Sequence, residues 1–229
     1  MTQEEYFGDW YPYIDAKSMD VALSYVSRER DFYPHAGNVF KAFTMCPARD
    51  TVAVFLGQDP YPQKDIATGI AFGNKADTPE DRLSPSLAVI KESVIDYARP
   101  HHVLAFDNTL ESWARQGILM LNCSLTVKPY VPSSHYLYWK PFITGFLERF
   151  SRGNGGIAYV LFGKQAQSFR DCISPVAGKI FEVEHPAALA RRHGLLPGTL
   201  FRDVGDYVHG VTARNIEWYH EEDYGEFTL

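Results

Sequence analysis

The feature that most constrains this fold is a short apolar run that stops abruptly. Residues 52–56 read Val-Ala-Val-Phe-Leu, and Gly57, the polar pair Gln58-Asp59 and Pro60-Tyr61-Pro62 follow. A continuous apolar run bounded by Gly and Pro is typical of a strand buried on both faces of a parallel sheet. Because open α/β sheets bind ligands at the carboxyl ends of such strands, the residues after Leu56 are candidates for chemistry. An ordinary strand followed by a turn is an alternative interpretation of the same residues.

Three further apolar runs predict strands over residues 118–121, 158–162 and 179–183. Helical patterns lie between them and before them. The clearest spans residues 139–150, and others are expected over residues 19–30, 38–43, 86–97, 165–172 and 201–209. In the clearest helix, one apolar face is formed by Trp139, Phe142, Ile143, Phe146, Leu147 and Phe150. The alternation predicts an α/β fold, a central four-stranded parallel sheet with helices on both faces, as a single domain over residues 1–229.

The composition is that of an ordinary globular protein. The chain has 229 residues, 45% hydrophobic and 22% charged, which suffices for one substantial core. No apolar run reaches the roughly 18 residues that a membrane span needs. The polar, acidic start resembles neither a signal nor a transit peptide. Because Cys46, Cys123 and Cys172 are odd in number and lack metal spacing, we expect reduced core thiols in a cytoplasmic protein. We also expect the protein to be a monomer.

The net charge of −6 argues mildly against a nucleic-acid partner. An enzyme that releases its product, however, needs only a local basic face. Arg191, Arg192 and His193 stand together and supply a candidate for such a face.

Polar residues follow three of the predicted strands. Asp59 with Gln58, Asn122 and His185 each stand at or just after a strand end. Because one sheet brings the carboxyl ends of its parallel strands to the same edge, these side chains can face a common ligand. Taken singly, Asn122 reads equally as a turn residue and His185 as a surface or packed residue.

Five segments, in order along the chain, resemble the motifs of the family 1 uracil-DNA glycosylases. They are Gly57-Gln58-Asp59-Pro60-Tyr61, Gly69-Ile70-Ala71-Phe72, Ser84-Pro85-Ser86-Leu87, Leu119-Met120-Leu121-Asn122 and His185-Pro186-Ala187-Ala188-Leu189. A sixth, Phe162-Gly163-Lys164-Gln165-Ala166-Gln167, is similar to a further family segment, and the likeness runs from about Tyr33 to Trp218. The resemblance implies hydrolysis of the bond between uracil and deoxyribose in DNA, after base flipping. It leaves an abasic site, starts base-excision repair and needs no metal or other cofactor.

The resemblance also assigns roles at the strand ends. As catalytic residues, Asp59 would stabilise the cationic sugar and orient or deprotonate water, and His185 would hydrogen-bond to uracil O2 as negative charge develops there. Asn122 would read the uracil edge, since cytosine reverses the groups at N3 and position 4. The uracil-binding set is completed by Gln58 through its backbone, by Tyr61 against the thymine methyl group, and by Phe72 stacked on the base. Phe72 alone would read as a core residue.

Seven residues are implied to contact DNA: Ser84, Pro85, Ser86, Lys164, Ala187, Leu189 and Arg191. Leu189 is the expected wedge that fills the vacated place in the base stack, although an exposed loop leucine is the plain alternative. Ser86 also suits an ordinary helix N-cap. Pro62 replaces a frequent His of the family, and Lys164 replaces a Ser near a DNA phosphate, which should strengthen that contact. Ala187-Ala188 replace a Ser-Pro pair, which removes a phosphate hydrogen bond and loosens the loop. We therefore expect weaker pinching or flipping of DNA, partly offset by Arg191 and Arg192.

Two other functions fit parts of the sequence. A DNA-binding accessory module on the same fold, such as a processivity subunit, would not need the full set of polar strand-end residues. A small-molecule α/β enzyme would need a phosphate-cradling glycine loop after the first strand, and none is present. The expected partners are therefore uracil-containing DNA, single- or double-stranded, and a proteinaceous inhibitor of uracil glycosylases, without a membrane.

Overall fold

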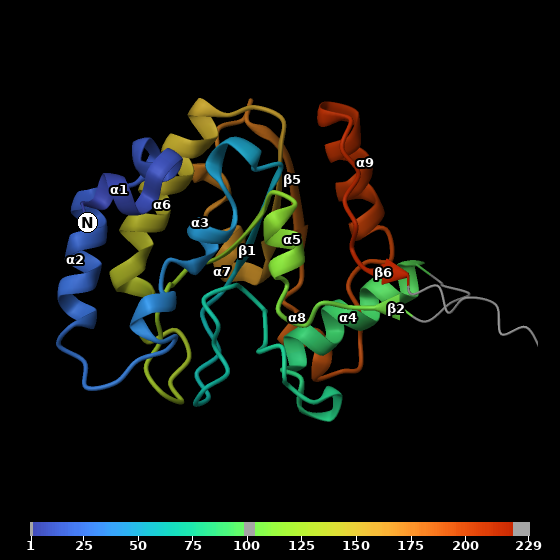
Figure 1. Ribbon diagram of the computed structural model, residues 1–229, viewed down its shortest axis with the longest axis horizontal. Helices are drawn as coiled ribbons and strands as arrows, with labels where there is room; N and C mark the ends of the chain where they lie inside the picture. Colours follow the sequence, from blue (N-terminus) through green and yellow to red (C-terminus); the bar gives the residue numbers. More distant parts are fainter. Residues whose placement is uncertain (1, 99–103, 222–229) are drawn as a thin grey trace, which may run out of the picture.

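The predicted strands form one parallel sheet at the centre of the molecule. The computed structural model describes residues 2–98 and 104–221. The sheet has the order β3-β1-β4-β5, with β1 Ala53–Gly57, β3 Ile118–Asn122, β4 Ile157–Phe162 and β5 Gly178–Val183. All three pairings are parallel, and helices cover both faces, so the predicted α/β class is confirmed (Figure 1).

Burial explains why the strands read as continuous apolar runs. Every residue of β1, β3 and β4 is buried, because helices cover these strands on both faces. The edge strand β5 is half-exposed, and polar residues are correspondingly interspersed along it. The pairing register sets Gly57 opposite Asn122, so β1 and β3 end at the same level.

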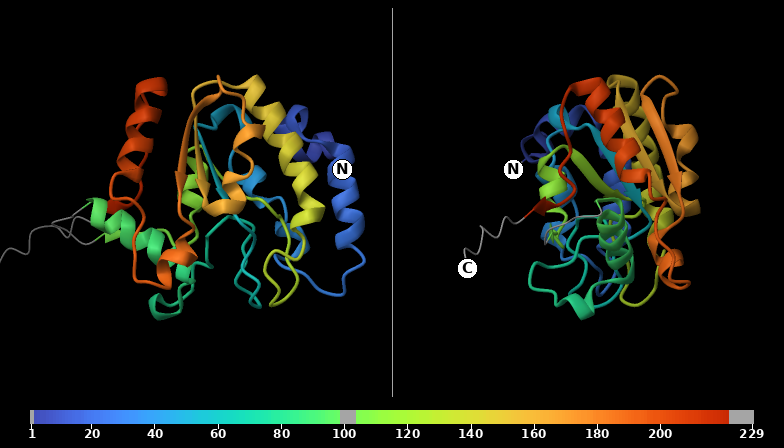
Figure 2. Two further views of the ribbon diagram at one scale, coloured as in Figure 1. Left: turned by 180° about the vertical axis from the view of Figure 1, so that it is seen from behind. Right: turned by 90° about the vertical axis from the view of Figure 1, so that its right-hand side faces the viewer.

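The helices lie in two layers (Figures 1 and 2). One layer contains α1 Gln3–Phe7, α2 Ala16–Val26, α3 Lys41–Met45 and α6 Tyr136–Gly153; α9 Leu200–Thr212 lies on the other side. At the carboxyl end of the sheet, α4 Pro85–Ala98 packs against α8 Pro186–Ala190. The remaining elements are α5 Glu111–Arg115, α7 Gly163–Gln167, and a small antiparallel pair, β2 Leu104–Ala105 with β6 His220–Glu221.

The predicted apolar face of α6 is the centre of one core layer. All six of its predicted residues are fully buried. Their rings meet those of the N-terminal segment: Trp10 lies 5.6 Å from Phe146 and 5.2 Å from Phe150, centroid to centroid. The indole of Trp10 donates to the carbonyls of Phe43 and Cys46. The first turns of the chain thereby pack against α6 and the end of α3.

Some predicted helix ends are wrong. The helix predicted over residues 165–172 divides into α7 and a 3-10 helix, Arg170–Cys172, and the one predicted over residues 19–30 stops at Val26. At both ends a serine hydroxyl donates to a backbone carbonyl three residues earlier: Ser168 to Gln165 and Ser27 to Ser24. Such bonds compete with the helical ladder. All three cysteines are free thiols, as predicted. Within residues 2–98 and 104–221, no helix is long and apolar enough to cross a membrane.

Candidate functional site

A cleft of about 860 Å³ opens at the carboxyl ends of the strands, and we call it the strand-end cleft. Its lining residues come from the loop after β1, the start of α4 and α8, and these elements lie at the lower end of the sheet in Figure 1. Of the thirteen residues to which the sequence assigns a role, the cleft wall contains Gln58, Asp59, Tyr61, Phe72, Ser84, Pro85, Ser86, Asn122, His185, Ala187 and Arg191. Lys164 and Leu189 are outside it.

Glycines let the catalytic candidates approach one another. A Cβ atom on Gly57 would lie 2.5 Å from Asn122 Oδ1 and 3.0 Å from Phe72 Cζ. A Cβ atom on Gly163, whose φ is +81°, would lie 2.7 Å from the Cβ of His185. No real side chain tolerates such distances, so these two glycines permit the close arrangement at the bottom of the cleft.

Asp59 is held by a loop that follows β3. The backbone N–H of Ser133 donates to Asp59 Oδ2 over 2.6 Å. Burial raises the pKa of Asp59 above its ordinary value, and hydrogen bonds from Ser133 and Gln58 oppose that rise. Ser133 Oγ also accepts from Gln58 Nε2 over 3.0 Å. Ser133 thus orients both polar residues that follow β1.

His185 is held as a neutral hydrogen-bond donor. Its Nδ1 accepts from the backbone N–H of Ala187 over 3.1 Å, as a side-chain cap of α8. An acceptor nitrogen carries no proton, so the proton of the neutral ring is on Nε2. Burial, aided by the charge of Arg191, lowers the pKa of His185 to about 4. The imidazole is therefore an uncharged N–H donor at neutral pH.

Asn122 and Phe72 lie deep in the cleft, with 8% and 6% of their surface exposed. Phe72 has a φ of +66°, unusual for a bulky residue, and its ring lies 5.8 Å from that of His185. The hydroxyl of Tyr61 donates to the carbonyl of Phe72 over 2.9 Å. An aromatic wall and a buried amide therefore face the same space as the Asp59 carboxylate.

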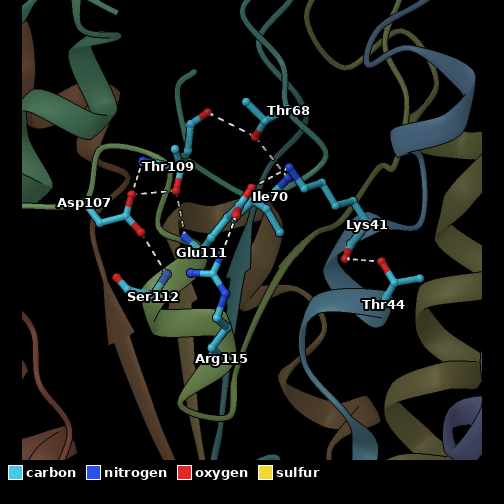
Figure 3. A network of polar contacts seen from close by, with 10 residues as sticks. Lys41, Thr44, Thr68, Ile70, Asp107, Thr109, Glu111, Ser112 and Arg115 are labelled. Atoms are coloured by element: carbon cyan, nitrogen blue, oxygen red, sulfur yellow. Dashed lines mark hydrogen bonds and ion pairs between the residues drawn. The ribbon is translucent and has the colours of Figure 1, made fainter. Parts of the chain in front are cut away.

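The loop that carries Phe72 is braced from behind (Figure 3). Thr68 Oγ1 accepts from the N–H of Ile70 and donates to the carbonyl of Gly73. On the neighbouring helix α5, Glu111 forms an ion pair with Lys41 over 2.7 Å. A Cβ on Gly73 would lie 2.4 Å from the carbonyl oxygen of Thr109, so the loop packs directly on backbone. This bracing supports the unusual φ of Phe72.

The serines at the start of α4 are more buried than the sequence suggests. Ser84 and Ser86 are 8% and 3% exposed, whereas Pro85 between them is exposed. The fully buried Asn74 donates to Ser84 Oγ over 2.7 Å and accepts from the N–H of Ser84 over 2.9 Å. The N-terminus of this 14-residue helix faces the cleft, where its free N–H groups favour an anion.

Leu189 lies in a helix and is buried, so its role as a wedge stays a prediction. Residues 186–190 form the helix α8, with Pro186 in its first turn and His185 as its cap, rather than an open loop. Helical winding turns Leu189 inward, where it is 5% exposed and belongs to the hydrophobic core. Ala187, Ala188 and Arg191 line the cleft instead. Lys164 is exposed at the second residue of α7, outside the cleft wall, so its contact with DNA stays a prediction.

Sequence reasoning missed several residues of the rim. Lys64, Arg82, Tyr130 and Pro132 line the cleft, and Ser133 binds Asp59. The residues from 128 to 134 belong to none of the recognised motifs and lie far from Asp59 in the sequence. Only the turn residues Pro129, Pro132, Ser133 and Ser134 marked a loop there.

In the described ranges, no group of three or more His, Cys, Asp or Glu side chains is gathered as for a metal ion. Three of the polar residues of the cleft are a carboxylate, an amide and a neutral imidazole (Asp59, Asn122 and His185), and they lie beside aromatic rings. Such a cleft can hold a flat, polar ring and stabilise charge that develops at its edge.

Comparison with known proteins identifies the class of protein to which this cleft belongs, that of enzymes that hydrolyse a base from DNA. The model of the uracil DNA glycosylase superfamily matches residues 43–207. This chain belongs to the uracil DNA glycosylase superfamily. A uracil-DNA glycosylase of Coxiella burnetii is 31% identical over 208 residues, 87% of each chain. One of Alkaliphilus metalliredigens is 29% identical over 221 residues, 92% of this chain and 94% of the relative.

Solved structures agree with the fold. The crystal structure of mimivirus uracil-DNA glycosylase matches with a TM-score of 0.72 at 18% identity, over 95% of this chain and 93% of that one. The Y322L variant of the mimivirus protein in complex with UGI matches with a TM-score of 0.76 at 20% identity, over 95% and 88%. At these identities the likeness concerns the fold.

Proposed function

We propose that this protein hydrolyses the N-glycosidic bond between uracil and deoxyribose in DNA, as a monofunctional glycosylase of the family 1 type. It leaves an abasic site and thereby starts base-excision repair. The observation that carries the proposal is the meeting of Asp59, Asn122 and His185 in one cleft with the Phe72 ring. Membership of the superfamily supports the same reaction.

Entry of the base requires flipping. The target atom is shielded inside a duplex, and unstacking costs a few kcal/mol, less from a single strand. Phosphates bound at the α4 N-terminus and by Arg191 would hold the strand while the base enters. Phe72 then stacks on the base plane without reading its sequence.

Recognition of uracil falls to a buried amide. Asn122 can donate to O4 and accept from N3–H, and cytosine reverses both groups. A reversed pair leaves buried polar atoms without partners, at about 1–3 kcal/mol each. The Tyr61 ring, fixed by its hydrogen bond to the Phe72 carbonyl, stands against C5 and rejects the thymine methyl group by collision.

The chemical step separates charge. The sugar becomes positive, and the ionised Asp59 stabilises it and orients the attacking water. Uracil leaves as an anion, and the Nε2–H of the neutral His185 donates to its O2. Because this donor is uncharged, it needs no counter-charge before the base binds. Its hydrogen bond strengthens as negative charge develops on uracil O2.

The test is cleavage of an oligonucleotide with a single uracil, with EDTA present, beside matched thymine and cytosine strands. We expect abasic product from uracil alone, and losses of 100-fold or more, an order-of-magnitude figure, in Asp59→Asn and His185→Ala. The matched controls are Asp206→Asn and His209→Ala, exposed residues of α9, which should retain full activity. Tight DNA binding without product would favour an accessory DNA-binding module instead.

We also propose a monomeric, cytoplasmic protein that a proteinaceous inhibitor can bind. The support for the inhibitor is the similarity to the mimivirus variant solved in complex with UGI. Size-exclusion chromatography of the mixture, with loss of uracil excision in the same sample, tests this. Free elution of both proteins with full activity would contradict it.

A further inference from the structure

One rim of the strand-end cleft carries a tyrosine outside the family-like motifs. Tyr130 is 69% exposed and lines the cleft together with Pro132. Its segment, residues 128–134, is yellow-green in Figures 1 and 2 and lies on the other side of the cleft from α4 and α8. A single exposed aromatic residue is normal on a protein surface, but a ring that borders a cleft is available to contact what the cleft binds.

Hydrogen bonds hold the backbone that carries this ring. Tyr130 has a φ of +62°, which L side chains rarely adopt. Its N–H donates to the carbonyl of Pro62 over 2.8 Å, and the N–H of Val131 donates to that of Lys128 over 3.1 Å. Three residues on, Ser133 donates to Asp59. A side chain on a held backbone can bind with less loss of conformational entropy than one on a mobile loop, and unusual backbone of this kind gathers at functional sites.

Charge near the ring disfavours a phosphate there. Burial chiefly raises the pKa of Tyr33, and the carboxylates of Asp31 and Asp65, with Tyr130, add to the rise, so two carboxylates lie near this rim. Of the cationic residues that line the cleft, Arg82 just precedes α4 and Arg191 is the C-cap of α8, whereas Lys64 lies in the loop after β1. A nucleic-acid strand would therefore direct its backbone to the cationic side and a base to the aromatic side.

Flipping creates the need for such a surface. When uracil leaves the stack, each neighbouring base loses a stacking partner on one face. Leu189 is buried in α8 and does not line the cleft in this structure, whereas Tyr130 does. We propose that Tyr130 is the stacking platform for a nucleobase adjacent to the flipped uracil. The inference rests on the proposed function and extends its substrate to a strand with an intact base beside the uracil.

The test is a binding cycle that involves no turnover. The probe is a fluorescein-labelled single strand with one 2′-fluoro-2′-deoxyuridine, which resists hydrolysis, flanked by normal bases or by an abasic spacer on its 5′ or 3′ side. We expect Tyr130→Ala to bind the intact probe about tenfold more weakly, and Tyr130→Phe to bind it like the wild type. With the spacer on the side that Tyr130 serves, the loss disappears, because the ring and the base are partners.

The control is Tyr11→Ala, an exposed tyrosine outside the cleft, which should bind every probe like the wild type. Thermal melting checks that each variant is folded. An unchanged affinity of Tyr130→Ala, an equal loss on all probes, or no binding of any probe by the wild type would overturn the inference. Failure of the wild type to release uracil from an ordinary strand would contradict the proposed function separately.

Discussion

At the scale of single residues, His185 determines how the protein responds to acid. Its folded pKa of about 4 lies below the ordinary 6.5, so the unfolded chain takes up a proton in this range and the folded one does not. The contribution of the neutral His185 to the free energy of unfolding is therefore complete above pH 6.5 and is lost as the pH falls towards 4. We expect 15N NMR at pH 5.5 to show a neutral ring with its proton on Nε2; an imidazolium or an Nδ1–H tautomer would contradict this.

Ser133 is the residue through which a distant loop controls Asp59. Its φ is +61°, so Ser133→Gly keeps the N–H in place, whereas the β-branched Ser133→Val strains the backbone and displaces it. We expect Gly to stay within about threefold of wild-type kcat and Val to lose roughly tenfold or more.

The pH profile separates these two variants further. The Ser133 N–H favours the ionised carboxylate, so its displacement raises the pKa of Asp59. Activity of Ser133→Val should then fall at a higher pH than that of the wild type on the acid side. Equal acid limbs in the two variants would show that the N–H does not tune Asp59.

At the scale of elements, α8 explains why Leu189 is a core residue. Truncation of a buried leucine costs about 2–5 kcal/mol of unfolding free energy, which includes the cavity left behind. We expect Leu189→Ala to show this loss in urea denaturation, with similar relative excision from single and double strands among the folded molecules. A selective loss on duplex DNA at unchanged stability would restore Leu189 as the wedge.

The pairing of β1 with β3 also carries a prediction. A methyl group on Gly57 would collide with Asn122 Oδ1, at 2.5 Å, and displace the amide that reads the base. We expect Gly57→Ala to lower kcat/KM by about 100-fold. Gly155→Ala is the matched control, because no atom lies within 4 Å of its Cβ position. Wild-type rates in both variants would show that the close approach is not required.

At the scale of the whole molecule, an acidic protein must bind a polyanion through one face. The net charge is −6, yet Lys64, Arg82 and Arg191 gather at the cleft. The logarithm of the binding constant for single strands should fall linearly with the logarithm of the salt concentration. Arg191→Ala should reduce the magnitude of that slope by about 0.7. Arg152→Ala, exposed at the end of α6, is the control. An unchanged slope in Arg191→Ala would remove Arg191 from the phosphate contacts.

The features that could be predicted from the sequence are those that a local pattern of apolar and polar residues determines. The α6 face and the strand ends at Asp59, Asn122 and His185 follow from periodicity and from abrupt changes of polarity. The position of Leu189 was not predictable, because a five-residue helix leaves too little periodicity to show which side faces inward. Ser133 and Tyr130 were missed because their roles depend on contacts between residues remote in sequence, which no local pattern encodes.

The most direct test of the account is the release of free base from single strands that carry one uracil, one cytosine or one thymine. Mass spectrometry after a single turnover at saturating enzyme measures that release without dependence on DNA affinity. The account predicts that the wild type releases only uracil and that Asp59→Asn releases uracil about 100-fold more slowly or slower still. Release of no base, or equal release by the wild type and Asp59→Asn, would contradict it.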